Sequence, residues 1–207
     1  MRKTFEIGGL FAAVVLIAFG IGALAMSVNG HNTVRDEISM QQITGTPDMT
    51  PAAIKGEAAK AGLTNVDLPT CTVADKAINS GSRARCFAQY MRIHTLEATG
   101  GQTYSQLPRY ATADGKGTND ASAALMKNGQ AVDNPVRNLW VTETALTTAL
   151  NTSYLAEQIS LFGIVVGIAL LLSGIGFGIL ALTGALRSRD ALLRLPKHAP
   201  GASIPVS

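Results

Sequence analysis

The most constraining feature of this chain is an uncharged apolar run, residues 159–182, that follows directly on an amphipathic segment. A helix needs about 20 apolar residues to cross a bilayer, so this run is long enough to span one. The amphipathic segment has no Gly and no Pro after Pro135, and Asn134 followed by Pro135 is typical of a helix start. We therefore expect one unbroken helix of roughly 50 residues, half of it in lipid and half in water.

A second uncharged run, residues 7–28, lies near the N-terminus. The alternative to a membrane span here is a signal peptide, because Arg2 and Lys3 precede the run and residues 23–25 (Ala-Leu-Ala) resemble a cleavage site. The apolar region of a signal peptide usually has about 7 to 15 residues, and this run is longer. Its length favours an anchor that is not cleaved.

The charged residues are sorted around these two runs. The segments outside residues 29–158 carry six basic and two acidic residues, whereas residues 29–158 carry 11 basic and 12 acidic ones. Basic residues that flank membrane spans stay in the cytoplasm, so both termini are expected to be cytoplasmic and residues 29–158 extracytoplasmic, at the plasma membrane. The net charge of +3 therefore marks membrane flanks and does not indicate a nucleic-acid partner.

The sequence thus predicts an all-α protein, a two-span transmembrane helical hairpin with a small exported helical domain. Its expected parts are a cytoplasmic stub (1–6), transmembrane helix 1 (7–28), the exported domain (29–158), transmembrane helix 2 (159–182) and a basic cytoplasmic tail (183–207) that is disordered at its end. Asn29-Gly30 is expected to break the first helix. Within the domain, short helices are expected at 33–43, 51–61, 72–79, 82–98 and 120–128.

An apolar stripe follows the aqueous half of the last helix. It consists of Leu139, Leu146, Leu150 and Tyr154, with Trp140 beside it. Such a stripe needs a cover, which we expect the 33–43 and 82–98 helices to supply.

Cys71 and Cys86 are the only cysteines, and both lie in the segment expected to be exported. An even number of cysteines outside the cytoplasm favours a disulfide bond, worth about 3 kcal/mol for a loop of this length. A redox role would need a closer pair such as C-x-x-C. Two free thiols are the remaining alternative.

The chain has three histidines: His31, His94 and His198. Their spacing matches no metal-binding motif, and His198 is expected on the other side of the membrane. Asp48, Glu97 or Asp120 could complete a site with His94, but no spacing places them together. Phosphate-binding and nucleophile motifs are absent from the sequence, so we assign no catalytic residue, no metal ligand and no cofactor.

Four glycines of the second apolar run lie near one helix face: Gly163, Gly167, Gly174 and Gly178. Small residues let helix backbones approach closely in lipid, where packing drives association. This face either packs on the first span or docks another copy or another protein, and both can hold together.

Residues 33–37 (TVRDE) and 42–51 (QITGTPDMTP), between a basic start with a Gly/Ala-rich run and a Gly-rich run with a basic end, resemble a group of actinobacterial two-span membrane proteins. The resemblance covers most of the chain in layout and only these stretches in motif. It implies the topology. Some members are named aromatic-ring-opening dioxygenases, which implies a non-heme iron site of two histidines and a carboxylate. The segment expected to be exported offers only His31 and His94.

Part of that motif is a candidate partner surface, formed by Thr46, Pro47, Asp48, Met49, Thr50 and Pro51. The alternative is a turn that sets the next helix, because Thr50 before Pro51 is a helix start.

These observations favour a non-enzymatic membrane protein of the cell envelope. It would be an accessory or scaffold subunit that contacts membrane lipid and binds a membrane protein partner or another copy of itself. The first alternative is a membrane-anchored sensor or ligand-binding module that acts through a partner, because the tail after the second run is too short for an output domain. An enzyme ranks third, since no catalytic constellation is present.

Overall fold

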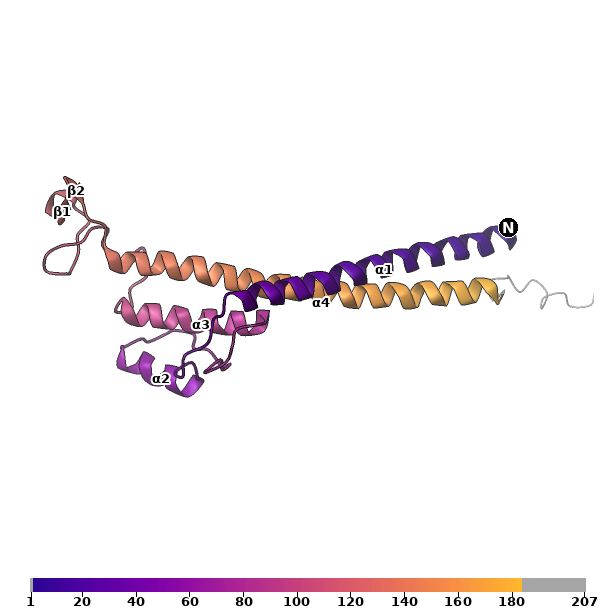
Figure 1. Cartoon of the computed structure of the whole chain (residues 1–207), viewed down its shortest axis with the longest axis horizontal. Helices are drawn as coiled ribbons and strands as arrows, with labels where there is room; N and C mark the ends of the chain where they lie inside the picture. The colour runs from indigo at the N-terminus through magenta and orange to yellow at the C-terminus, as the bar shows by residue number, and fades with distance from the viewer. Residues whose placement is uncertain (1, 184–207) are drawn as a thin grey trace, which may run out of the picture. The chain divides into compact units, whose positions relative to one another are not determined.

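The computed structural model describes residues 2–183, and the predicted disordered end of the tail lies outside these residues. The described chain is mostly helical, which confirms the helical class. Its elements are α1 (Arg2–Met40), α2 (Pro51–Lys60), α3 (Gly81–Ala98), the short 3₁₀ helix η1 (Ala121–Ala123), β1 (Met126–Lys127), β2 (Gln130–Ala131) and α4 (Pro135–Leu182) (Figure 1). Two of the helices, α1 and α4, are long and apolar enough to cross a membrane.

The last helix forms as predicted. Asn134 caps it, because the side-chain oxygen of Asn134 accepts a hydrogen bond of 3.1 Å from the backbone N–H of Val136. Pro135 is the first helical residue, and the helix continues without a break to Leu182. At 1.5 Å per residue its length is about 72 Å.

The chain divides into two compact units, and the first comprises the start of α1 up to Ala25 and α4 from Ile164 onward. Glycines mediate the contact between these two helix segments. A Cβ added at Gly167 would lie 2.8 Å from Leu24, and one added at Gly174 would lie 2.8 Å from Ile17. Because contacts move backward along α1 as they move forward along α4, the two segments are antiparallel.

The second unit, residues 26–163, is a helical domain in which α3 lies between α2 and the first half of α4 (Figure 1). Its apolar core is closed by the end of α1, where Ile38 is buried. The largest fully buried side chains of this core are Tyr90, Met49, Ile54, Ile78, Ile93 and Val73. Helix α3 supplies more buried residues to the core than any other helix, because it is covered on two sides.

The face of α4 that meets α3 differs from the predicted stripe at one end. Leu150 is buried and Leu146 packs on the core, as expected, but Leu139 is 45% exposed and Trp140 takes its place with 4% exposed. The indole N–H of Trp140 donates to the carbonyl of Gln102 at 2.9 Å, which fixes the ring over the loop after α3. Apolar residues at both 139 and 140 leave open which of the two faces α3. The hydrogen bond to Gln102 favours Trp140.

The predicted helix break at Asn29-Gly30 is wrong, because α1 runs through it to Met40 and absorbs the expected 33–43 helix. Gly30 lies against α4, where an added Cβ would be 3.1 Å from the hydroxyl of Ser160. Tertiary contacts of this kind override a weak local preference. The glycine serves close helix approach rather than a turn.

The predicted helix at 72–79 is also wrong. This segment pairs by backbone hydrogen bonds with residues 43–49, among them Gly45 N–H to the carbonyl of Lys76 (3.0 Å) and Ile78 N–H to the carbonyl of Ile43 (2.8 Å). Gly45 is buried, and a side chain there would collide with the carbonyl of Val73. The backbone N–H and C=O groups that a helix at 72–79 would pair internally therefore bond to residues 43–49 instead.

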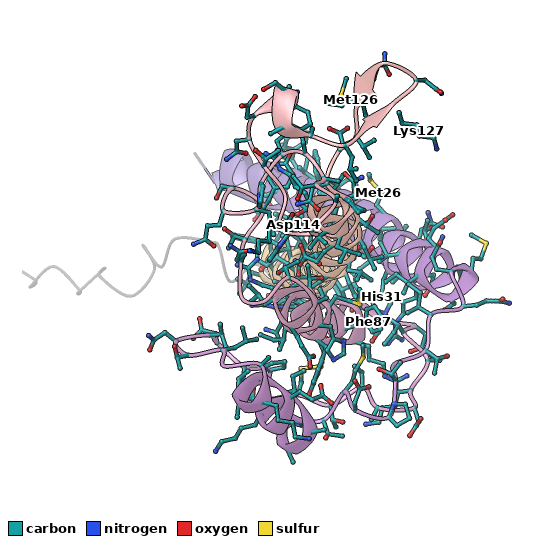
Figure 2. The ribbon with its side chains drawn as sticks, turned by 90° about the vertical axis from the view of Figure 1, so that its left-hand side faces the viewer. Met26, His31, Phe87, Asp114, Met126 and Lys127 are labelled. Atoms are coloured by element: carbon teal, nitrogen blue, oxygen red, sulfur yellow. A yellow bond between two sulfur atoms is a disulfide. The ribbon has the colours of Figure 1, made fainter. Side chains whose placement is uncertain are left out.

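Residues 120–128, predicted as a helix, contain only η1 and then enter the β1–β2 hairpin. Asn128 and Gly129 both have positive φ (52° and 77°), which suits a tight hairpin turn. Met126 and Lys127 lie on this hairpin, away from the helices of the domain (Figure 2). The two-residue strands that flank this turn are too short to be predicted from the sequence.

We predict that Gly174→Ala destabilises the protein and that Gly176→Ala does not. At 174 the methyl group would lie 2.8 Å from Cγ1 of Ile17 and 3.0 Å from the carbonyl oxygen of Ala13, which is backbone and cannot move aside. Overpacking of this kind costs about 1–3 kcal/mol. At 176 the methyl group would meet no described atom within 4 Å beyond the adjacent backbone of α4 itself. Thermal denaturation in detergent measures both variants, and equal melting temperatures would contradict the packing described.

Candidate functional site

The two cysteines form the predicted disulfide, Cys71–Cys86, with 6.1 Å between their Cα atoms. The bond attaches the loop before α3 to the second turn of that helix. Tyr90 strengthens the attachment, because its hydroxyl donates to the carbonyl of Cys71 at 2.7 Å. Burial raises the pKa of the Tyr90 hydroxyl above its ordinary value, so the group stays protonated as a donor.

The residues predicted as a partner surface occupy the turn between α1 and α2. Met49 is 2% exposed and belongs to the core. The hydroxyl of Thr50 accepts a hydrogen bond of 3.2 Å from Ala53 N–H, which caps α2, and Pro51 is the first residue of that helix. Thr46 and Pro47 are exposed. Asp48 points toward a histidine of α3, described below.

The four predicted glycines of α4 are placed on the side that faces α1. Gly167 and Gly174 make the close contacts of the first unit, and an added Cβ at Gly178 would lie at an ordinary 3.7 Å from Ala13. In the second unit, a Cβ at Gly163 would collide with the hydroxyl of Ser27. The alternative in which this face docks another chain stays a prediction.

A buried carboxylate joins three helices of the domain. Glu157 of α4 is 4% exposed, and its Oε2 accepts a hydrogen bond of 2.8 Å from the backbone N–H of Gly81, the first residue of α3. Its Oε1 accepts one of 3.0 Å from Nε of Arg35 on α1, and His31 Nδ1 lies 3.9 Å from the same oxygen. A carboxylate at a helix N-terminus is also favoured by the helix dipole.

Two cation–π contacts continue this interface along α3. The guanidinium carbon of Arg85 lies 4.8 Å from the centroid of the Tyr154 ring, and that of Arg92 lies 5.5 Å from Trp140. Together with Gly81 and Glu157, these contacts show that α3 runs antiparallel to α4.

A second polar cluster lies on the other side of α3 and combines Asp48, Glu57 and His94. Nε2 of His94 lies 3.2 Å from Oδ2 of Asp48 and 3.6 Å from Oε2 of Glu57. One ligand atom from each of the three residues lies within 4.8 Å of the others, a spacing that a metal ion can bridge. The cluster is thus the arrangement in the described chain that metal chemistry fits best.

Sequence reasoning found part of this cluster. Of the three acids predicted as possible partners of His94, only Asp48 lies beside it, whereas Glu97 is exposed and Asp120 is hydrogen-bonded locally. Hydrogen bonds from the hydroxyl and the backbone N–H of Ser122 lower the pKa of Asp120. Glu57 was missed, although its place beside Ile54 and Ala58, on the buried face of α2, was a usable signal.

Comparison with protein-family models, with curated proteins and with solved structures found no match to this chain. The resemblance to the actinobacterial two-span group therefore stays a prediction. The features that bear on function are the cluster around Glu157, the Asp48–Glu57–His94 cluster and the two long apolar helices.

We predict that Glu157→Gln lowers the free energy of unfolding by about 1.5–3 kcal/mol, because a Gln amide accepts in place of only one carboxylate oxygen and turns an N–H toward Arg35 or Gly81. Glu143→Gln is the matched control. Glu143 is equally buried, but its carboxylate accepts hydrogen bonds from the hydroxyls of Thr144 and Thr147.

Hydroxyl groups can rotate to donate or accept, so the control is expected to lose less than about 1 kcal/mol. Chemical denaturation of both variants in the same detergent measures the difference. A larger loss for Glu143→Gln than for Glu157→Gln would contradict the role assigned to Glu157.

Proposed function

We propose that this chain is a two-span integral membrane protein of the cell envelope with an extracytoplasmic helical domain. The observation that carries the proposal is the exposure of its two long helices, since only 11% of the apolar window of each is buried. An apolar core helix of a soluble protein would be mostly buried. Phe11, Phe19 and Leu172 are 65–70% exposed on the paired helix segments, which suits lipid better than water.

Charge and redox chemistry support the proposed orientation. Basic residues at both ends of the chain favour cytoplasmic termini. The Cys71–Cys86 disulfide supports an oxidising compartment for the segment between the two spans. The hairpin of spans and the exported position of residues 29–158 therefore agree with two independent features of the chain.

Within the envelope, the proposed role is that of a non-enzymatic accessory or scaffold subunit for a membrane protein partner. A second small-residue face on α1 supports this role, because Ala18, Gly22 and Ala25 are exposed. An added Cβ at Gly22 would meet no described atom within 4 Å. Such faces let a further helix approach closely in lipid.

A ligand-binding module that acts through a partner is the second candidate. The specific observation that favours it is the Asp48–Glu57–His94 cluster in the segment proposed to be exported. The two candidates are compatible, because the outward face of α1 and this cluster belong to different units.

The partner proposal predicts that a second membrane protein co-purifies in stoichiometric amount with the tagged chain after crosslinking in native membranes. Gly22→Leu should remove this protein by blocking close helix approach, whereas Gly176→Leu, at another open position, should retain it. Mass spectrometry of both pull-downs gives the readout. Recovery of the tagged chain alone would overturn the accessory role, and crosslinks between two copies would identify a homo-oligomer instead.

The topology is tested separately by attaching a membrane-impermeant thiol reagent to single cysteines placed at Lys116 and, in a second variant, at Thr4. Labelling of intact cells at 116 and protection at 4 is expected. Labelling at position 4 would place the N-terminus outside and overturn the orientation.

A further inference from the structure

The Asp48–Glu57–His94 cluster draws its members from three separately stabilised segments. Asp48 lies in the turn closed by the hydrogen bond from Met49 N–H to the carbonyl of Thr46 (3.0 Å). Glu57 lies on α2, whose start is fixed by Thr50. His94 lies on α3, which the disulfide attaches to the preceding loop. The three side chains are therefore brought together by the fold and not by adjacency in the sequence.

Two atoms of the cluster are buried without a hydrogen bond. Nε2 of His94 and Oε2 of Glu57 have no hydrogen-bond partner among the described residues, although both are shielded from solvent. Buried polar atoms of this kind are rare, because each one costs about 1–3 kcal/mol when it is left unsatisfied. Both atoms lie within 4.8 Å of each other and of an oxygen of Asp48, so a single cation at this point would satisfy all three.

We infer that Asp48, Glu57 and His94 bind one divalent transition-metal ion, with Zn²⁺ as the representative. The inference goes beyond the accessory role, does not depend on it, and gives the ligand-binding candidate a defined ligand class. An imidazole nitrogen with two carboxylate oxygens is a donor set that Zn²⁺ accepts, whereas Mg²⁺ and Ca²⁺ prefer oxygen ligands throughout. Three protein ligands leave a fourth position of a tetrahedral site for water or a partner's side chain.

Solvent access supports binding and exchange at this site. The side chains of His94, Asp48 and Glu57 are 25%, 37% and 28% exposed, so each reaches the surface while its inner atoms face one another. The competing explanation is a plain ion pair in which protonated His94 sits between two carboxylates. A metal requires neutral imidazole, so metal and proton compete for Nε2 and binding should weaken as the pH falls.

The test uses the full-length protein without a histidine tag, purified in detergent and stripped with a chelator that is then removed. Calorimetric titration with Zn²⁺ should show one site per chain, and Co²⁺ should give the visible absorption of a bound ion. His94→Gln should weaken binding by more than the roughly 10–100-fold that loss of an outer-shell partner costs. His31→Gln is the matched control, because His31 faces Glu157 instead, and it should bind as the parent does.

Circular dichroism establishes that each variant is folded. Because Asp48 lies in a turn and not in a helix, Asp48→Asn supplies a second variant, in which Zn²⁺ binding should also weaken at least about tenfold. The melting temperature of the parent should rise with Zn²⁺ while that of His94→Gln stays unchanged.

Three outcomes would overturn the inference. They are an absence of Zn²⁺ binding by the parent, equal binding by the parent and His94→Gln, and Mg²⁺ binding as tight as Zn²⁺ binding. None of them bears on the pull-down with Gly22→Leu, so the metal site and the accessory role fail separately.

Discussion

The carboxylate of Glu157 is the interaction on which the helical domain depends. It is buried, so it must be fully hydrogen-bonded, and it finds its donors on two other helices, at Gly81 and Arg35. A hydrogen bond to a charged group contributes about 1.5–3 kcal/mol, which is a large part of the stability of a small domain. The glycine is part of the same arrangement, because a Cβ at Gly81 would lie 2.7 Å from the Cα of Tyr154.

Hydrogen bonds to both carboxylates explain why the buried face of α4 tolerates acids. Positions 143, 150 and 157 follow one another at intervals of seven and share the buried face of the helix. Two of them are glutamates where a heptad pattern would favour leucine. A search of this segment for apolar residues alone would omit both glutamates. It would therefore miss Glu157, the residue that orients α3.

The sequence predicts the regular helices better than the irregular segments. The Asn134-Pro135 start, the extents of α2 and α3 and the disulfide follow from local chemistry, and the structure has them. The errors at Asn29-Gly30 and at 72–79 have one cause, which is that the decisive contacts come from residues far along the chain. A glycine that serves close approach and a glycine that serves a turn look alike in a sequence.

The candidate metal site illustrates the same limit. His94 and Asp48 could be suspected individually, but Glu57 joins them only because α2 packs on α3. An acid beside two buried apolar residues of a short helix is the one local sign that it faces inward. Sequence spacing carries no such information when three ligands come from three segments.

The position of Glu157 in the chain also sets an order of assembly. Arg35 precedes it by 122 residues and Gly81 by 76. At synthesis rates of 5–20 residues per second, Arg35 waits about 6–24 s for its partner to emerge. During that interval the N–H groups of Arg35 and Gly81 donate to water instead of to the carboxylate. The domain therefore stays incomplete until α4 has been synthesised. The hydrogen bonds of Glu157 to Arg35 and Gly81 therefore form last, and a nascent chain truncated before Glu157 cannot form them.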